Sequence, residues 1–139
     1  MENTNEMKIV FDSRPENEGL ARVAVAAFCT QLNPTLEEVS DLKTAVSEAV
    51  TNCIVHAYED TEGIIKLRAT LLDNVLEIEI SDNGKGIEDV ELARKPLYTT
   101  KGNLERSGMG FTIMESFMDE IEIHSVVGIG TKVVMKKRI

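Results

Sequence analysis

Tryptophan is absent from this chain of 139 residues, aromatic residues make up 4% of it, and cysteine occurs twice. Cys29 and Cys53 lie within apolar helical patterns and form no Cys-x-x-Cys spacing, so we expect buried free thiols rather than a zinc or redox motif. No apolar run approaches the ~20 residues that span a bilayer. Residues 1–6 are polar and lack the pattern of a signal peptide. We therefore expect a cytoplasmic protein without a membrane partner.

Basic residues are fewer than acidic ones, with 15 Lys and Arg compared with 24 Asp and Glu, and the net charge is −9. Such a chain is poorly suited to hold a phosphate backbone, so no direct nucleic-acid partner is expected. It is suited to meet a basic protein surface, although the same acidic excess can serve solubility alone. The length and the apolar share of 42% favour a single globular domain over 1–139.

Hydrophobic periodicity predicts an α+β order of elements. The expected elements are a strand at 7–12, helices at 13–32 and 35–58, strands at 64–71 and 75–81, a short helix at 88–94, a helix at 110–117 and strands at 120–125 and 131–137. We expect a two-layer α/β sandwich, with a mixed, mostly antiparallel sheet covered by helices on one face. The polar segment at 95–107 is long for a loop inside a compact domain, which is typical of a functional loop.

Both long helices carry start signals and apolar stripes. Ser13 with Glu16, and Thr35 with Glu38, have the spacing of a capping box. The core stripe of the first helix is expected at Leu20, Val23, Ala24, Ala27, Phe28 and Leu32. The core stripe of the second is expected at Leu36, Val39, Leu42, Val46, Val50 and Cys53. Polar residues at 48, 52 and 56 form another stripe on the second helix, which must face water or a pocket.

Two glycine-containing motifs could approach a ligand. Asp82-Asn83-Gly84-Lys85-Gly86 follows a strong strand, where the glycines allow close backbone approach and the carboxylate can accept a hydrogen bond from an amine. A tight turn explains these residues equally well. Gly108-Met109-Gly110 opens a helix and presents backbone N–H groups to an anion. Alone, that second motif is weak evidence.

Polar groups on the second helix add to this picture. The amide oxygen of Asn52 can hold Mg²⁺, and Glu48, one turn earlier, can act as a base beside a metal-bound phosphate. An exposed polar helix face is the competing interpretation. Thr131 follows Gly128 and Gly130 at the start of the last strand, which by itself indicates only a hairpin.

Taken in order, these motifs resemble the four nucleotide-binding boxes of the GHKL (Bergerat-fold) ATPases, which include gyrase, MutL and the histidine kinases. Local runs resemble more narrowly the anti-sigma serine kinases, and among them the sporulation anti-sigma F factors. These runs are residues 16–18, 20–23, 47–52, 99–101 and 105–114. The resemblance extends from about residue 7 to the C-terminus.

The resemblance implies an ATP/ADP site. Asp82 would accept the adenine amino group, Thr131 would support it through water, and Gly84 and Gly86 would pass close to the base. At the phosphates, Asn52 would hold Mg²⁺ and Glu48 would be the base on a serine hydroxyl. The segment at 95–107 would be an ATP lid, with phosphate contacts at Thr99, Lys101, Arg106, Gly108, Met109 and Gly110. Arg106 would stabilise the charge that develops on the γ-phosphate.

The resemblance also implies partners. An RNA polymerase sigma factor, most closely sigma F, would bind a surface that includes Arg22, and a STAS-type anti-anti-sigma protein would be the phosphorylated substrate. Ala21, Val25 and Cys29 on the first helix are apolar beyond its stripe, so we predict a homodimer contact there. A stress-response anti-sigma kinase and a nucleotide-dependent binding module with little catalysis remain alternatives. A histidine kinase would need a phosphorylated His on a separate helical hairpin, for which this chain has no room.

Overall fold

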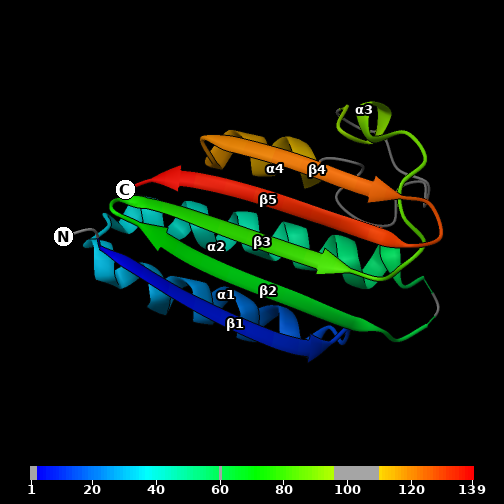
Figure 1. Ribbon diagram of the computed structural model, residues 1–139, viewed down its shortest axis with the longest axis horizontal. Helices are drawn as coiled ribbons and strands as arrows, with labels where there is room; N and C mark the ends of the chain where they lie inside the picture. The colour runs from blue at the N-terminus through cyan, green and yellow to red at the C-terminus, as the bar shows by residue number, and fades with distance from the viewer. Residues whose placement is uncertain (1–2, 60, 96–109) are drawn as a thin grey trace.

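Five strands and a layer of helices make up the computed structural model, which describes residues 3–59, 61–95 and 110–139. The strands are β1 (Thr4–Asp12), β2 (Ile64–Leu72), β3 (Val75–Asp82), β4 (Glu120–Val126) and β5 (Gly130–Arg138). The helices are α1 (Glu16–Cys29), α2 (Leu36–Asn52), α3 (Val90–Ala93) and α4 (Gly110–Phe117), with a 3₁₀ turn η1 (Thr30–Leu32) and a π-helical turn η2 (Cys53–Ala57). Each predicted element that falls in the described residues is present, with ends shifted by a few residues (Figure 1).

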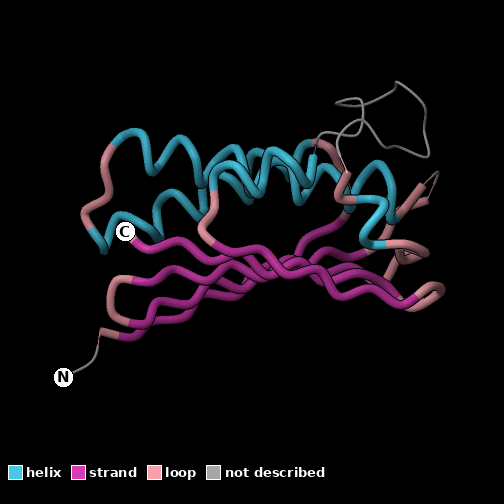
Figure 2. The backbone as a smooth tube through the Cα atoms, turned by 90° about the horizontal axis from the view of Figure 1, so that it is seen from above, coloured by secondary structure: helices cyan, strands magenta, loops and turns pink. Residues whose placement is uncertain are grey.

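The sheet has the order β1-β2-β3-β5-β4. Every pairing between the described strands is antiparallel, so the expected mixed sheet is here an antiparallel one. Short connections explain this, because β2–β3 and β4–β5 are hairpins, and Asp73 takes the left-handed φ of 55° that the first turn needs. The helices cover one face of the sheet, which confirms the two-layer arrangement (Figure 2).

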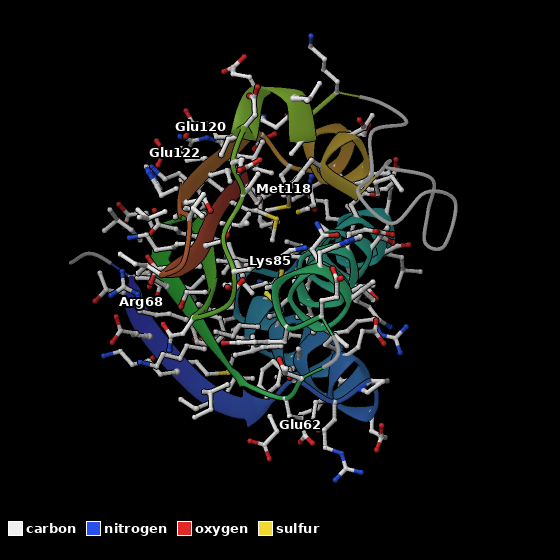
Figure 3. All side chains as sticks on the ribbon, turned by 90° about the vertical axis from the view of Figure 1, so that its right-hand side faces the viewer. Glu62, Arg68, Lys85, Met118, Glu120 and Glu122 are labelled. Carbon is white, nitrogen blue, oxygen red and sulfur yellow. The ribbon has the colours of Figure 1, made fainter. Side chains whose placement is uncertain are left out.

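Apolar and polar side chains alternate along the strands, so the two faces of the sheet differ in polarity. Leu76, Ile78 and Ile80 of β3 are buried under the helices, as predicted. The other face carries ion pairs between neighbouring strands, including Lys132 with Glu79 at 3.8 Å. Figure 3 shows Arg68, Glu120 and Glu122 on this outer face, away from the helices. No helix within the described ranges is long and apolar enough to cross a membrane.

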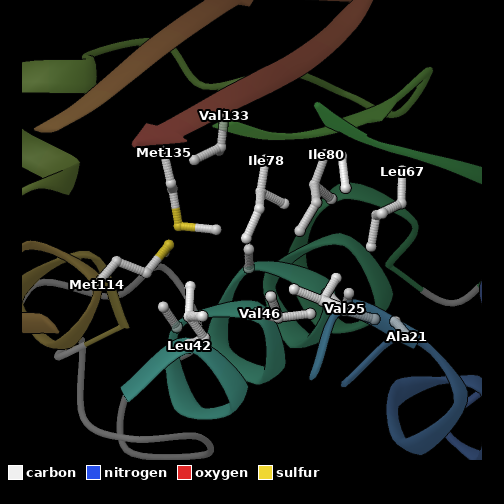
Figure 4. Close-up of a cluster of buried hydrophobic side chains, with 14 of the residues drawn as sticks. Ala21, Val25, Leu42, Val46, Leu67, Ile78, Ile80, Met114, Val133 and Met135 are labelled. Carbon is white, nitrogen blue, oxygen red and sulfur yellow. The ribbon is translucent and has the colours of Figure 1, made fainter. Parts of the chain in front are cut away.

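The core lies between α1, α2 and α4 on one side and the sheet on the other (Figure 4). Leu42 and Val46 of α2 meet Ile78 and Met135 of the sheet, and Met114 joins them from α4. The Thr35–Glu38 capping box is confirmed, with Glu38 N–H donating to Thr35 Oγ1 at 3.1 Å and Thr35 N–H donating to Glu38 Oε1 at 2.9 Å. α2 is therefore fixed at its start and packed along its length.

The predicted cap of α1 is wrong. Pro15 is the residue before the helix, and no side chain caps it. The Ser13 hydroxyl instead accepts a hydrogen bond at 2.8 Å from the N–H of Gly63, and Ser13 N–H donates to the Gly63 carbonyl at 2.9 Å. The spacing of Ser13 and Glu16 predicted the wrong partner, because Ser13 bonds to Gly63, which directly precedes β2 and is distant in the sequence.

The predicted core stripe of α1 is right at Phe28, which is buried, and at Leu32, which packs against the core, but it is wrong at Leu20 and Val23. Leu20 and Val23 are 54% and 59% exposed. The buried set is Ala21, Val25, Phe28 and Cys29. Ala21 and Cys29 are small side chains, which permit a close approach of α1 to α2 on this side. The predicted dimer contact through Ala21, Val25 and Cys29 is therefore wrong, since all three lie in the core. Leu36, placed in the stripe of α2, is 90% exposed as the first residue of that helix.

Candidate functional site

A cavity of about 630 Å³ opens at the end of the molecule where α2 stops. Its wall brings together predicted residues from separate segments of the chain: Asn52, Asp82, Gly86, Gly110 and Thr131. The volume is in the range of small-molecule sites, about 300–1,000 Å³. Folding thus places most of the described motif residues around one space.

Asp82 is held in a fixed orientation at the end of β3. Its Oδ1 accepts hydrogen bonds from the N–H of Gly84 at 2.9 Å and from the N–H of Thr131 at 3.2 Å. The side chain is only 8% exposed. Buried carboxylates need such donors, and these two connect the glycine turn to β5. The carboxylate is positioned to accept a further hydrogen bond from a ligand amine, as the sequence motif predicts.

Cys53 lies in the cavity wall next to this carboxylate. Burial raises the pKa of the Cys53 thiol well above 9.0, and the neighbouring charge of Asp82 and a hydrogen bond to its side chain raise it further. The thiol therefore stays protonated near neutral pH and acts as a donor to Asp82. The expectation of buried free thiols is confirmed for both cysteines.

Tyr58 is a site residue that the sequence analysis missed. Its hydroxyl donates to the carbonyl of Ile64 at 2.7 Å and accepts from the N–H of Asn83 at 2.6 Å. Asn83 follows Asp82 directly, so the phenol ties the end of β3 to the start of β2. Burial raises the pKa of Tyr58. An aromatic polar residue just after a helix was the available signal, since a buried Tyr usually has a partner for its hydroxyl.

The glycines of the turn are required by neighbouring backbone. A Cβ at Gly84 would meet the carbonyl group of Ala57, at the end of η2. Gly86 has a φ of 78°, and a Cβ there would lie 2.5 Å from the carbonyl oxygen of Val126. Gly86 lines the cavity, whereas Gly84 does not. Close approach to protein backbone therefore explains both glycines, and Gly86 also lies next to the space for a ligand.

Lys85 connects the same turn to η2. Its N–H donates to the Ala57 carbonyl at 3.1 Å, and its Nζ lies 2.9 Å from Oε2 of Glu59. Figure 3 shows Lys85 on the loop that crosses this end of the molecule. π-Helical turns occur often at functional sites, and η2 begins directly after Asn52. The turn and the end of α2 are thus fixed against each other.

Ser125 is a second residue that the sequence analysis missed. Its Oγ accepts from the N–H of Ile87 at 2.7 Å and lies 2.8 Å from Oγ1 of Thr131. It also lies 3.2 Å from the carbonyl oxygen of Gly130. A serine on an alternating strand gives no sequence signal for such a role.

The polar stripe of α2 divides between core and cavity. Asn52 lines the cavity. A Cβ at Gly110 would lie 3.2 Å from both polar atoms of the Asn52 side chain, so the start of α4 lies against Asn52. His56 also lines the cavity. Glu48 is 6% exposed and is not part of the cavity wall in the described residues. Asn52 and His56 of the stripe therefore face a pocket, whereas Glu48 is buried beside it in the sequence but outside the cavity wall.

The remaining predicted residues are not in this wall. Arg22 lies on α1, where its Nε is 3.9 Å from Oε1 of Glu18. Thr99, Lys101, Arg106, Gly108 and Met109 fall outside the described residues, as does nearly all of the expected lid at 95–107. Within the described ranges, no group of three or more His, Cys, Asp or Glu side chains could hold a metal ion.

Comparison with known proteins agrees with this architecture. Residues 11–137 match the model of the histidine kinase-like ATPase domain. The anti-sigma F factor of Caldanaerobacter subterraneus subsp. tengcongensis is 59% identical over 139 residues, covering 100% of this chain and 97% of that protein. The anti-sigma F factor of Clostridium kluyveri is 56% identical, covering 96% of this chain and 94% of the relative.

Solved structures with the same fold are more distant in sequence. The RsbU and RsbW domains of a Mycobacterium tuberculosis protein match with a TM-score of 0.69 and 19% identity, over 96% of this chain and 32% of that one. The catalytic domain of histidine kinase ThkA matches with a TM-score of 0.59 and 15% identity, over 95% of both chains. At these identities the similarity establishes the fold alone.

The fold and the cavity define an ATPase domain of the histidine kinase type, and such a domain binds ATP. The chain belongs to the histidine kinase-like ATPase family and, within it, to the family of the anti-sigma F factors.

Proposed function

We propose that the chain is an anti-sigma factor that binds and inhibits an RNA polymerase sigma factor and, as an ATP-dependent serine kinase, phosphorylates its anti-anti-sigma antagonist. The observation that carries the proposal is the cavity in which Asn52, Asp82, Gly86, Gly110 and Thr131 meet. The full-length identity to proteins named anti-sigma F factor supports the choice of sigma F as the partner.

At the base end of the cavity, Asp82 accepts the adenine amino group and Thr131 supports the ring beside it. The support for this assignment is the orientation of the carboxylate, whose Oδ1 is already held by two backbone N–H groups. A fixed acceptor selects a ligand that carries a donor at that position. Adenine has such a donor in its amino group, whereas guanine and hypoxanthine present a carbonyl oxygen there.

At the phosphate end, the residues present fit a magnesium ion. Asn52 supplies an amide oxygen at the cavity wall beside Gly110, and Mg²⁺ commonly takes few protein ligands because it keeps several waters. Asn52 would hold the ion, and bound Mg²⁺ neutralises phosphate charge. Thr99, Lys101, Arg106, Gly108 and Met109 keep their predicted roles at the phosphates.

Glu48 is the proposed general base. It accepts the proton of a serine hydroxyl on the protein substrate while the serine oxygen bonds to the γ-phosphorus and the bond from that phosphorus to the β–γ bridging oxygen breaks. ADP is the leaving group, and phosphoserine is the product. Its place one turn before Asn52, with 6% exposure, supports the role because it puts a carboxylate near the phosphate end and away from bulk water. Arg106 stabilises the transferring group.

The sigma factor is proposed to bind a surface that includes Arg22. This side chain is partly exposed on α1, outside the cavity wall, so it is accessible to a protein partner while nucleotide is bound. Replacing Arg22 by Ala should weaken capture of sigma F in a pull-down or titration. Lys66→Ala, an exposed charge change on the outer face of the sheet, is the control. Wild-type affinity of Arg22→Ala would remove Arg22 from the interface.

Transfer of labelled γ-phosphate from Mg-ATP to an anti-anti-sigma protein tests the kinase assignment. We expect phosphoserine with the wild type and loss of transfer with Glu48→Gln, in which the side chain keeps its size but cannot take the proton. ATP binding by the variant, measured in parallel, shows that the pocket is intact. Binding of ATP by the wild type without any transfer would favour the alternative, a nucleotide-dependent module that sequesters sigma.

A further inference from the structure

Ser125 stands at the junction of the two segments that form the base end of the cavity. Its hydroxyl contacts the N–H of Ile87, from the glycine turn, and the side chain of Thr131, from β5. Ser125 does not itself line the cavity, whereas Thr131 does. Any effect of Ser125 on a ligand therefore passes through Thr131 or through Ile87, which both line the cavity.

The direction of the hydrogen bond between the two hydroxyls depends on where the single proton of Ser125 goes. A serine hydroxyl has one proton and two lone pairs. Ser125 Oγ already accepts from Ile87 N–H at 2.7 Å. If its proton goes to the carbonyl oxygen of Gly130 at 3.2 Å, its second lone pair accepts from Thr131, and if it goes to Thr131 Oγ1 at 2.8 Å, Thr131 is the acceptor. Bonds between oxygen atoms are most favourable near about 2.7–2.8 Å, so Thr131 is the better acceptor.

A threonine that accepts from Ser125 keeps its own proton for another partner. Within the described parts of the chain, no other hydrogen bond involves the Thr131 hydroxyl. Thr131 lies in the cavity wall, and its backbone N–H is bonded to Asp82, so its hydroxyl is adjacent to the carboxylate that would hold the adenine amino group. Ring nitrogen N1 of adenine, which is an acceptor, is two bonds from that amino nitrogen.

We propose that Ser125 is a positioning residue for base recognition, which turns the Thr131 hydroxyl into a donor toward N1 of adenine, directly or through one water. The inference rests on the proposed nucleotide function of the cavity. Together, Asp82 as an acceptor and Thr131 as a donor match the donor–acceptor edge of adenine. Hypoxanthine, with a carbonyl oxygen and a protonated N1, presents the opposite pattern.

The test compares binding of ADP and 1-deaza-ADP, which lacks the N1 acceptor, by isothermal titration to the full-length protein. The wild type should prefer ADP. In Ser125→Ala, Thr131 no longer receives a proton from residue 125, and the preference should fall by about fivefold, the order expected for one hydrogen bond. Ser125→Thr retains a hydroxyl and should restore the preference.

A merely structural role gives a different result. Loss of the Ile87 contact alone would weaken ADP and 1-deaza-ADP by the same factor, so the ratio of the two dissociation constants would stay at the wild-type value and overturn the proposal. A thermal unfolding curve for each variant shows whether it is folded at the titration temperature. Failure of the wild type to bind ADP would instead refute the proposed function.

Discussion

Asp82 draws its properties from neighbours on its own turn and on other segments of the chain. Two backbone N–H groups fix one oxygen, and the Cys53 thiol donates to the same carboxylate. This arrangement keeps a charged group in a cavity that is otherwise largely apolar, at the point where a ligand donor is expected. The free energy of burying the Asp82 carboxylate therefore depends on whether the Cys53 thiol is protonated.

Because of Cys53, the free energy of unfolding should change with pH in the alkaline range. Below 9.0, the thiol is protonated in the folded and the unfolded chain. Above this value the unfolded chain loses the proton while the folded chain keeps it, so the free energy of unfolding falls as the pH rises. Cys53→Ser, which does not titrate in this range, should show a shallower fall in urea titrations at a series of pH values.

Cys29→Ser is the matched control for this experiment. Burial also raises the pKa of Cys29, but less strongly than that of Cys53, so its replacement should flatten the pH dependence less. Parallel curves for the wild type and Cys53→Ser would contradict the raised pKa of the Cys53 thiol, to which burial contributes most and Asp82 adds.

Sequence patterns located single residues well when the chemistry was local. The run from Asp82 to Gly86 and the Asn52 position were identifiable because their spacing carries the chemistry. Tyr58 and Ser125 were not identifiable, since their partners lie on β2, β3 and β5 and only folding brings them together. Long-range hydrogen bonds of this kind leave no periodic signal in the chain.

Among the elements, α2 is the one that joins core and site. Its start is capped, its middle packs against the sheet, and its last residue, Asn52, reaches the cavity before the chain continues into η2. The capping box matters for function because a shift along the helix axis would move Asn52 away from α4.

Thr35→Ala should lower the free energy of unfolding by about 1 kcal/mol, the usual loss for a threonine helix cap. The physical reason is the loss of the bond from Glu38 N–H to Thr35 Oγ1. Urea denaturation measures the change. Thr61→Ala, the same replacement at an exposed position, should be nearly neutral, and equal effects at both positions would refute the importance of the cap.

The order and kind of the elements were predictable because most apolar periods are long and clear. The inward side of α1 was not. Apolar residues cover more than one side of that helix, so periodicity alone could not choose between Leu20 with Val23 and Ala21 with Val25. The contact of α1 with α2 decides the matter, since the smaller side chains permit closer packing.

At the scale of the whole molecule, the helix layer has an outer side that carries exposed apolar residues of α1. We keep the proposal of a homodimer and place its contact at Leu20 and Val23, which are 54% and 59% exposed. Exposed apolar groups on one helix face are the kind of surface that a second copy can cover.

Val23→Glu should therefore turn a dimer into a monomer in light scattering at micromolar concentration, because it places a charge in the contact. Val10→Glu makes the same change at a residue that is 62% exposed on the outer face of the sheet, and it should leave the dimer intact. A wild type that is already monomeric at this concentration would contradict the homodimer.

The two-layer architecture supports one central claim, that the cavity at the end of α2 binds ATP through Asp82. Isothermal titration of Mg-ATP into the wild type and Asp82→Asn tests it most directly, with Asp12→Asn as an exposed control. We predict one binding site and a loss of about 10- to 100-fold in affinity for Asp82→Asn alone, as expected for a hydrogen bond to a charged group. Unchanged affinity in Asp82→Asn, or no binding by the wild type, would contradict the claim.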